Sequence, residues 1–268
     1  MKRILISVVL AAICLSSFGQ KQEEKKKFQI KGQPIVTVFA NYHAGIGNAN
    51  KESGFALDRA YLGYQFSLTE KLSGKVVFDM GSTKVSGSDL ERVAYIKNAM
   101  LSWKTGNFTL DFGLIGLEQF NVQEKFWGYR YIMKSFQDEY KFGSSADMGI
   151  LGKYKFTKWL SADITISNGE GYKKLNGDNK YRYAVGATIL PVKNLTLRAY
   201  YDLASKNIEE DETKDQQNLA FFAGYKHELF SIGAEYNQMY NTKFKEDNDQ
   251  SGFSVYSTIK LEDQFNLF

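Results

Sequence analysis

The 268-residue sequence predicts an all-β fold, a transmembrane antiparallel β-barrel with an inward-folded long loop. Two observations predict it. Segments of alternating apolar and polar residues recur along the chain, and short turns between them alternate with longer polar loops. Successive short turns lie about 35 residues apart, except for one gap of about 50, as expected of a barrel with short periplasmic turns and long external loops. These turns are 69–71, 105–107, 157–158, 191–194, 227–228 and 262–264.

The N-terminus has the pattern of a secretory signal peptide. The basic residues Lys2 and Arg3 precede an apolar segment over 4–15, and Ser17 and Gly19 are small residues before a cut at Gln20. We expect a signal peptide over 1–19, a charged periplasmic arm over 20–33, and a barrel domain over 34–268. An uncleaved anchor is the alternative.

Composition excludes some classes of function. The only cysteine is Cys14, so a chain without its signal has neither a disulfide nor a thiolate site. Net charge is +4, and removing Lys2 and Arg3 leaves +2, which together with the lack of a recognition motif excludes nucleic acid as a partner. Beyond residue 20 no apolar run approaches the 18 residues or so that a spanning helix needs.

The alternation predicts about twelve strands, each with an apolar and a polar face. For example, Leu195, Leu197 and Ala199 oppose Thr196 and Arg198. A dry core would not tolerate the unpaired charges of the polar face, so we expect the apolar face to contact outer-membrane lipid and the polar face to line water. The strands are expected over 34–43, 56–68, 72–81, 94–104, 108–116, 147–156, 159–168, 181–190, 195–204, 217–226, 229–239 and 252–261.

The C-terminal residues resemble the start of a thirteenth strand. Phe268 is an aromatic end of the kind that closes such barrels, but Glu262, Gln264 and Asn266 occupy positions that a closing strand makes apolar. We therefore expect a chain that is truncated at its C-terminus. A closed twelve-stranded barrel is the alternative.

The longest gap between strands covers 117–146 and mixes aromatic and charged residues without strand alternation. It follows the fifth strand, where general porins fold a loop into the lumen. We expect Phe126 and Trp127 to lie against the wall, with Arg130 and Lys134 towards water, so that the loop narrows the channel. An extracellular lid outside the pore is the alternative.

Charged residues of the polar faces and of the loop are the candidates for lining the pore. Basic and acidic groups are nearly balanced, and a mixed field across a wide pore suits passive diffusion of small hydrophilic solutes. Each pair has a second interpretation as a salt bridge that stabilises the wall. The candidates are Arg59, Lys75, Asp79, Asp111, Arg130, Lys134, Asp163, Arg182, Arg198, Asp202, Lys226 and Glu235.

Three fragments resemble the phosphate-selective porin O and P family of Gram-negative outer membranes. Residues 54–64 are similar to its second strand, and 126–130 and 146–149 are similar to its inward loop and the following strand. The resemblance implies a homotrimer of barrels with about sixteen strands each, selecting anions such as phosphate through lumen arginines. Arg59 and Arg130 are then the nearest candidates for that role. The chain departs from the pattern in having few lumen arginines, accompanied by acidic residues, and fewer strands.

Enzymatic activity is not expected. The sequence has no nucleophile elbow, no metal-spaced histidine cluster and no phosphate-binding glycine loop, so we expect no catalytic residue, no cofactor and no metal. A barrel lipid hydrolase would have to use His43, because the only other histidine, His227, lies in a short turn. A structural or adhesive barrel with a plugged lumen is the remaining alternative.

Overall fold

The computed structural model describes residues 29–45, 53–82, 89, 92–174, 179–205, 213–262 and 265–267. The expected signal peptide over 1–19 and most of the expected arm over 20–33 therefore lie outside the described residues, as does Phe268. The last residues of the expected arm belong to the first strand, which begins at Lys31.

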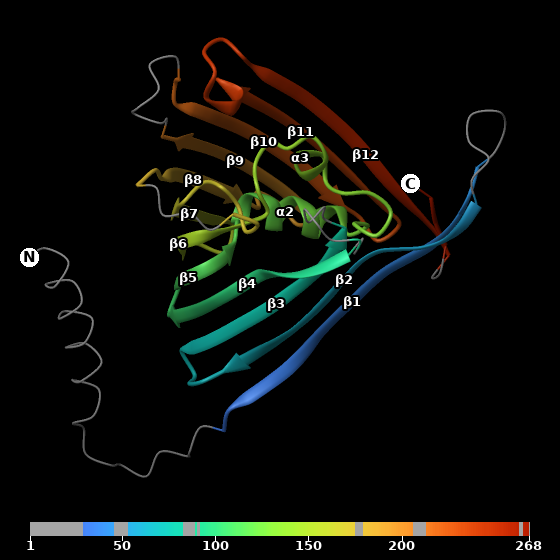
Figure 1. Cartoon of the computed structure of the whole chain (residues 1–268), viewed down its shortest axis with the longest axis horizontal. Coiled ribbons are helices and arrows are strands. Elements are labelled where there is room, and N and C mark those ends of the chain that lie inside the picture. The colour runs from blue at the N-terminus through green and yellow to red at the C-terminus, as the bar shows by residue number, and fades with distance from the viewer. Residues whose placement is uncertain are drawn as a thin grey trace, which may run out of the picture.

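The described strands form one antiparallel sheet in sequence order (Figure 1). All twelve expected strands are present, with ends within three residues of their expected positions, and a short thirteenth strand follows. The strands are β1 (Lys31–Ala44), β2 (Ser53–Ser67), β3 (Leu72–Ser82), β4 (Arg92–Thr105), β5 (Phe108–Gly116), β6 (Ala146–Lys155), β7 (Leu160–Ser167), β8 (Arg182–Ile189), β9 (Leu195–Ala204), β10 (Gln216–Lys226), β11 (Phe230–Tyr240), β12 (Gln250–Glu262) and β13 (Phe265–Leu267).

Short turns join the strand pairs as the sequence predicts. In two of them a threonine hydroxyl fixes the turn, because Thr69 Oγ1 accepts a hydrogen bond from the Leu72 amide at 2.9 Å and Thr157 Oγ1 accepts one from Leu160 at 3.0 Å. In the turn between β4 and β5, Gly106 has a φ of 53°, which an L side chain rarely adopts. Local turn chemistry thus sets the hairpin register.

The two faces of the sheet have the expected and opposite character. On β7, Ile164 and Ile166 are exposed on the outer face, whereas Asp163 and Thr165 are buried on the inner face. A water-soluble sheet would bury its isoleucines and expose its aspartates. The reverse arrangement fits a wall with hydrocarbon outside and polar groups inside.

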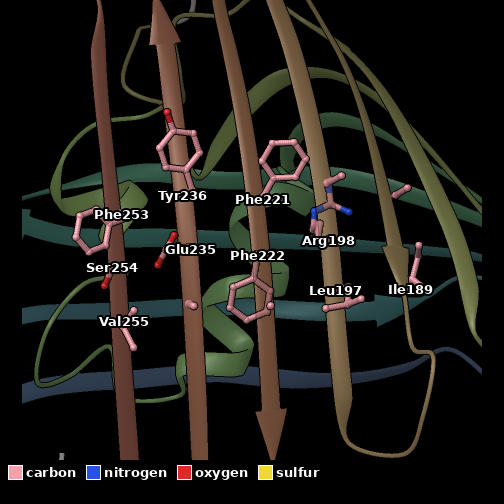
Figure 2. Close-up of a pocket in the computed structure, with 14 residues that line it drawn as sticks. Ile189, Leu197, Arg198, Phe221, Phe222, Glu235, Tyr236, Phe253, Ser254 and Val255 are labelled. Atoms are coloured by element: carbon pink, nitrogen blue, oxygen red, sulfur yellow. The ribbon is translucent and has the colours of Figure 1, made fainter.

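The outer face also carries a shallow apolar groove of about 530 Å³ across β8 to β12 (Figure 2). Small residues on neighbouring strands form its floor, since Ala187 pairs with Ala199 and Ala223 pairs with Ala234. Aromatic side chains such as Phe221 border it. It is a local hollow in the apolar outer surface.

The sheet is curved but open. Among the described residues β1 pairs only with β2, and no ladder joins β1 to β12 or β13. The closed twelve-stranded barrel is therefore not what the described strands form. The structure also contains the helices α2 (Glu118–Trp127) and α3 (Phe136–Glu139) and the short 3₁₀ helix η2 (Thr242–Phe244). No helix in the described ranges is both long and apolar enough to cross a membrane.

Candidate functional site

The long loop after β5 lies within the curve of the sheet (Figure 1). α2 begins directly after β5 and ends at Gly128, whose φ of 75° lets its amide bond back to the Glu124 carbonyl at 2.9 Å. The chain then reverses and forms α3 before it enters β6. The inward-folded loop predicted from the sequence is confirmed, and it contains helices that the sequence reasoning had not predicted.

Apolar contacts hold the start of α2 against β5 and β6. Phe120 packs with Ile115, Leu117 and Leu151 in a buried cluster, with Met100 at its margin. Ile115 and Leu151 are wholly buried on the inner face of the sheet. This apolar patch on the inner face is the surface on which the start of α2 packs.

Aromatic contacts hold the end of α2 against β10 and β12. The Phe126 ring lies 5.2 Å from the Phe222 ring, and the Trp127 ring lies 5.0 Å from the Tyr256 ring, both in edge-on geometry. A Cβ added at Gly224 would lie 2.5 Å from the Phe126 ring, so glycine is needed for this close approach. Phe126 and Trp127 thus lie against the wall, where the sequence placed them.

Buried hydrogen bonds complete the attachment of the loop to the wall. Gln137 Nε2 donates to Asn237 Oδ1 at 2.6 Å, and Asn218 Nδ2 donates to the Phe142 carbonyl at 2.8 Å. Gln119 Oε1 accepts a hydrogen bond from Arg198 Nε at 2.9 Å. Because these partners span β9 to β11, the loop is attached along a broad strip of the inner face.

A charged cluster in the loop lies on the side away from this strip. Arg130 Nη1 lies 2.5 Å from Glu124 Oε1 and 2.7 Å from Asp138 Oδ2. Burial raises the pKa of Glu124 above its ordinary value, and Arg130, followed by Lys97, offsets that effect only in part. Burial lowers the pKa of Arg130, but Glu124 and then Tyr61 outweigh it, so this pKa is raised and Arg130 stays charged.

Lys134 lies in a different setting from Arg130. Its Nζ pairs with Glu139 Oε2 at 3.2 Å, and both side chains are about half exposed. The two basic residues that the sequence assigned to one constriction therefore have different carboxylate partners. Of the two residues expected to lie towards water, Lys134 is half exposed, whereas Arg130 is largely buried between two carboxylates, in line with the second interpretation as a salt bridge.

Seven of the candidate wall residues form ion pairs between strands. Arg198 Nη1 lies 2.7 Å from Asp163 Oδ2, and Arg59 Nε lies 3.2 Å from Asp79 Oδ1. Asp111 binds Lys153 at 3.1 Å. The remaining pair joins Arg182 to Asp202, which also accepts a hydrogen bond from Tyr200. Most of the expected lumen charge is thus balanced locally.

Three candidates have no oppositely charged partner within the described part of the chain. Lys226 is exposed, and its Nζ lies 5.9 Å from the Phe126 ring centroid. Lys75 on β3 is half-buried. Glu235 on β11 is 4 % exposed. Its carboxylate accepts a long hydrogen bond of 3.5 Å from Asn237 Nδ2. Figure 2 shows Glu235 on β11 with Ser254 on neighbouring β12.

Sequence reasoning missed Lys97 on β4. Its Nζ donates to the Tyr61 hydroxyl at 3.1 Å and lies 4.5 Å from the Tyr61 ring centroid. In the β3–β4 register Val77 faces Asn98 and Phe78 faces Ile96, so Lys97 is the extra residue of a β-bulge. Strict alternation cannot predict such a residue. An irregularity in the polar pattern of 95–98 was the available signal.

The described residues offer no metal site, since none of them form a group of three potential ligands from His, Cys, Asp and Glu. His43 Nδ1 lies 3.4 Å from Asn41 Oδ1 in an exposed position. Within the described ranges no serine hydroxyl bonds to His43, so the nucleophile and base pair of a barrel hydrolase is not assembled there.

Comparisons with known proteins establish the fold. No protein-family model matches the chain, and no curated protein matches it. Among solved structures it is similar to OprB of Pseudomonas putida, with 12 % identity over 88 % of this chain and 71 % of that chain and a TM-score of 0.59. It is also similar to outer-membrane expressed OmpT of Vibrio cholerae, with 15 % identity over 91 % of this chain and 75 % of that chain and a TM-score of 0.56. A variant of that protein lacking loop L8 gives 14 % identity over 89 % and 78 %, with a TM-score of 0.52. The chain therefore has the fold of Gram-negative outer-membrane β-barrels.

Proposed function

We propose that this chain is an outer-membrane porin through which small hydrophilic solutes diffuse passively. The observation that carries the proposal is the pairing of an exposed apolar outer face with a charged inner face on an outer-membrane barrel fold. Such a wall separates lipid from a polar interior, and a polar interior admits hydrated solutes. The proposal includes export through a cleaved signal peptide and involves no covalent chemistry.

The loop would narrow the passage opposite β2 to β4. Its aromatic side chains contact β10 and β12, whereas Arg130 and Glu124 act electrostatically on Tyr61 and Lys97 of the opposite wall. The loop thus extends from one wall towards the other. We call the resulting constriction the eyelet and define it by Arg59, Lys75, Asp79, Lys97, Glu124, Arg130 and Asp138.

The eyelet favours anions weakly. Four basic groups face three carboxylates there, and the carboxylates are paired with Arg59 and Arg130. Lys75 and Lys97 have no carboxylate partner among the described residues, so their charge remains available to a passing solute. Anion selection, phosphate as a solute and a homotrimer, all implied by the family resemblance, belong to this proposal.

Planar-bilayer recordings on the purified full chain test the proposal. Open, ohmic steps are expected, and their reversal potential in a KCl gradient should indicate a modest preference for chloride. Replacing both Lys75 and Lys97 with glutamine should shift the reversal potential towards cation preference, because a charged ring acts where the pore is narrow. Lys71→Gln, in an exposed turn between β2 and β3, is the matched control and should leave it unchanged.

The same recordings separate the alternative function. The many contacts between the loop and the wall favour, as a second candidate, a structural barrel whose lumen the loop plugs. Silent bilayers with correctly folded protein would support the plug and reject the porin. Open channels whose reversal potential does not change when Lys75 and Lys97 are replaced would support the porin but contradict the proposed eyelet.

A further inference from the structure

A cavity lies between the loop and the wall, and none of the eyelet residues lines it. It has a volume of about 340 Å³ and lies between the segment 127–140 and strands β11 and β12. Five aromatic residues line it: Trp127, Phe136, Tyr140, Phe253 and Tyr256. A space of this size accommodates a small organic solute, and aromatic walls restrict which solute it prefers.

Glu235 contributes a carboxylate to this cavity without a balancing charge. Three other buried carboxylates of the wall each pair with an arginine: Asp79, Asp163 and Asp202. Glu235, in contrast, has no basic group within ion-pair distance in the described part of the chain. The side chain is nevertheless almost fully buried. Burying a carboxylate without a partner is costly, so the position suggests a partner that comes from outside the chain.

Two hydroxyls of the cavity lining are also unsatisfied. Ser135 is 6 % exposed, and neither its Oγ nor the Tyr256 hydroxyl oxygen has a hydrogen-bond partner among the described residues. Buried polar atoms are usually bonded, and orphaned ones that share a cavity indicate a missing ligand or water. Lys134 at the cavity is balanced by Glu139, so the unbalanced charge in the lining is negative.

We propose that this cavity is a binding subsite for a small organic ammonium cation. Aromatic ring faces attract cations, and a buried carboxylate supplies the counter-charge. A metal ion is a poorer fit, because the described residues contain no group of three potential ligands. The inference rests on the proposed function only for access through a water-filled interior. It adds a cation subsite to a pore whose eyelet favours anions.

Isothermal titration calorimetry on the full chain in detergent tests the subsite directly, with choline chloride as the probe and sodium chloride as the salt control. Saturable choline binding is expected, and Glu235→Gln should weaken it at least tenfold. Glu228→Gln, in an exposed turn, is the matched control and should bind like the unaltered protein. Lys134→Gln should tighten choline binding, because it leaves Glu139 unpaired beside the cavity.

The outcomes are distinct from those of the conductance experiment. Choline binding that is equal in Glu235→Gln and the unaltered protein would overturn the subsite, and so would saturable binding of glucose in place of choline. Lys134→Gln tests the subsite independently of how well Glu235→Gln folds, because a folding defect would weaken choline binding whereas Lys134→Gln is expected to tighten it. Silent bilayers with intact, Glu235-dependent choline binding would reject the porin and leave the subsite standing.

Discussion

Arg198 on β9 reaches past β8 to bind Asp163 on β7 through two hydrogen bonds, of 2.7 and 3.0 Å. Gly186 on β8 makes this possible, because a Cβ there would lie 2.4 Å from Arg198 Nη2. Arg198 also binds Thr188 and Gln119, so the same side chain ties three strands to α2. The pair therefore has a structural role in the wall in addition to its place in the proposed lumen.

We predict that Asp163→Asn lowers the free energy of unfolding by about 3 kcal/mol, because it leaves the buried Arg198 without its counter-charge. Urea titration of the detergent-solubilised protein, followed by tryptophan fluorescence, measures the loss. The control is Glu139→Gln, which breaks a half-exposed pair and should cost less than about 1 kcal/mol. Equal losses in the two variants would show that the Arg198 pair is no more important than a surface contact.

We predict that Gly224→Val loosens the loop from the wall, because the added side chain would overlap the Phe126 ring. Trypsin should then cleave after Lys125 and Arg130 faster than in the unaltered protein. The matched control is Gly54→Val on β2, where a Cβ meets nothing within 4 Å. Unchanged cleavage in Gly224→Val would mean that the contact of Phe126 with β10 does not hold the loop against the wall.

The selectivity of the channel should depend on pH through Glu124. Burial raises its pKa, so on acidification Glu124 takes up a proton at a higher pH than an ordinary glutamate does. Losing this negative charge should increase anion preference, measured as the reversal potential during stepwise acidification. The step should vanish in Glu124→Gln, and a step that persists there would assign the titration to another group.

The same raised pKa fixes the sign of the effect on stability. The folded protein retains the Glu124 proton in a pH range where the unfolded chain has released it. The contribution of Glu124 to the free energy of unfolding therefore falls as pH rises from the ordinary glutamate pKa through the raised one. Unfolding midpoints of the Glu124→Gln variant should lack this decline over that range.

The sequence predicted the strands well because their signal is local. Alternation with a period of two, interrupted by polar turns, placed all twelve strands and both faces, and Ile164 and Asp163 lie as predicted. The partners of the inward charges were less accessible to prediction. Arg198 reaches Asp163 across an intervening strand, and such a contact depends on register, curvature and a glycine in the middle strand.

Two further features that the sequence does not predict, the bulge at Lys97 and the helix α2, have physical causes. The bulge at Lys97 inserts one residue into β4 and shifts the alternation, which brings both Lys97 and Asn98 to the inner side. The sequence does not predict α2, because its segment lacks one continuous apolar face. Within the fold, Phe120 and Phe126 contact the wall, while Glu124 pairs with Arg130 on the other side. Its helical form depends on a wall that is distant in the sequence.

The separate settings of Arg130 and Lys134 lead to the last prediction. Arg130→Gln should shift selectivity towards cations, because Glu124 and Asp138 would both lose their counter-charge beside the eyelet. Lys134→Gln should leave the reversal potential almost unchanged, since Lys134 and Glu139 form an exposed pair at the other cavity. Reversal potentials of the two single variants in a KCl gradient measure the difference. Equal shifts would place both residues at one constriction, as the sequence alone suggested, and would contradict the division of the loop into an eyelet side and a cavity side.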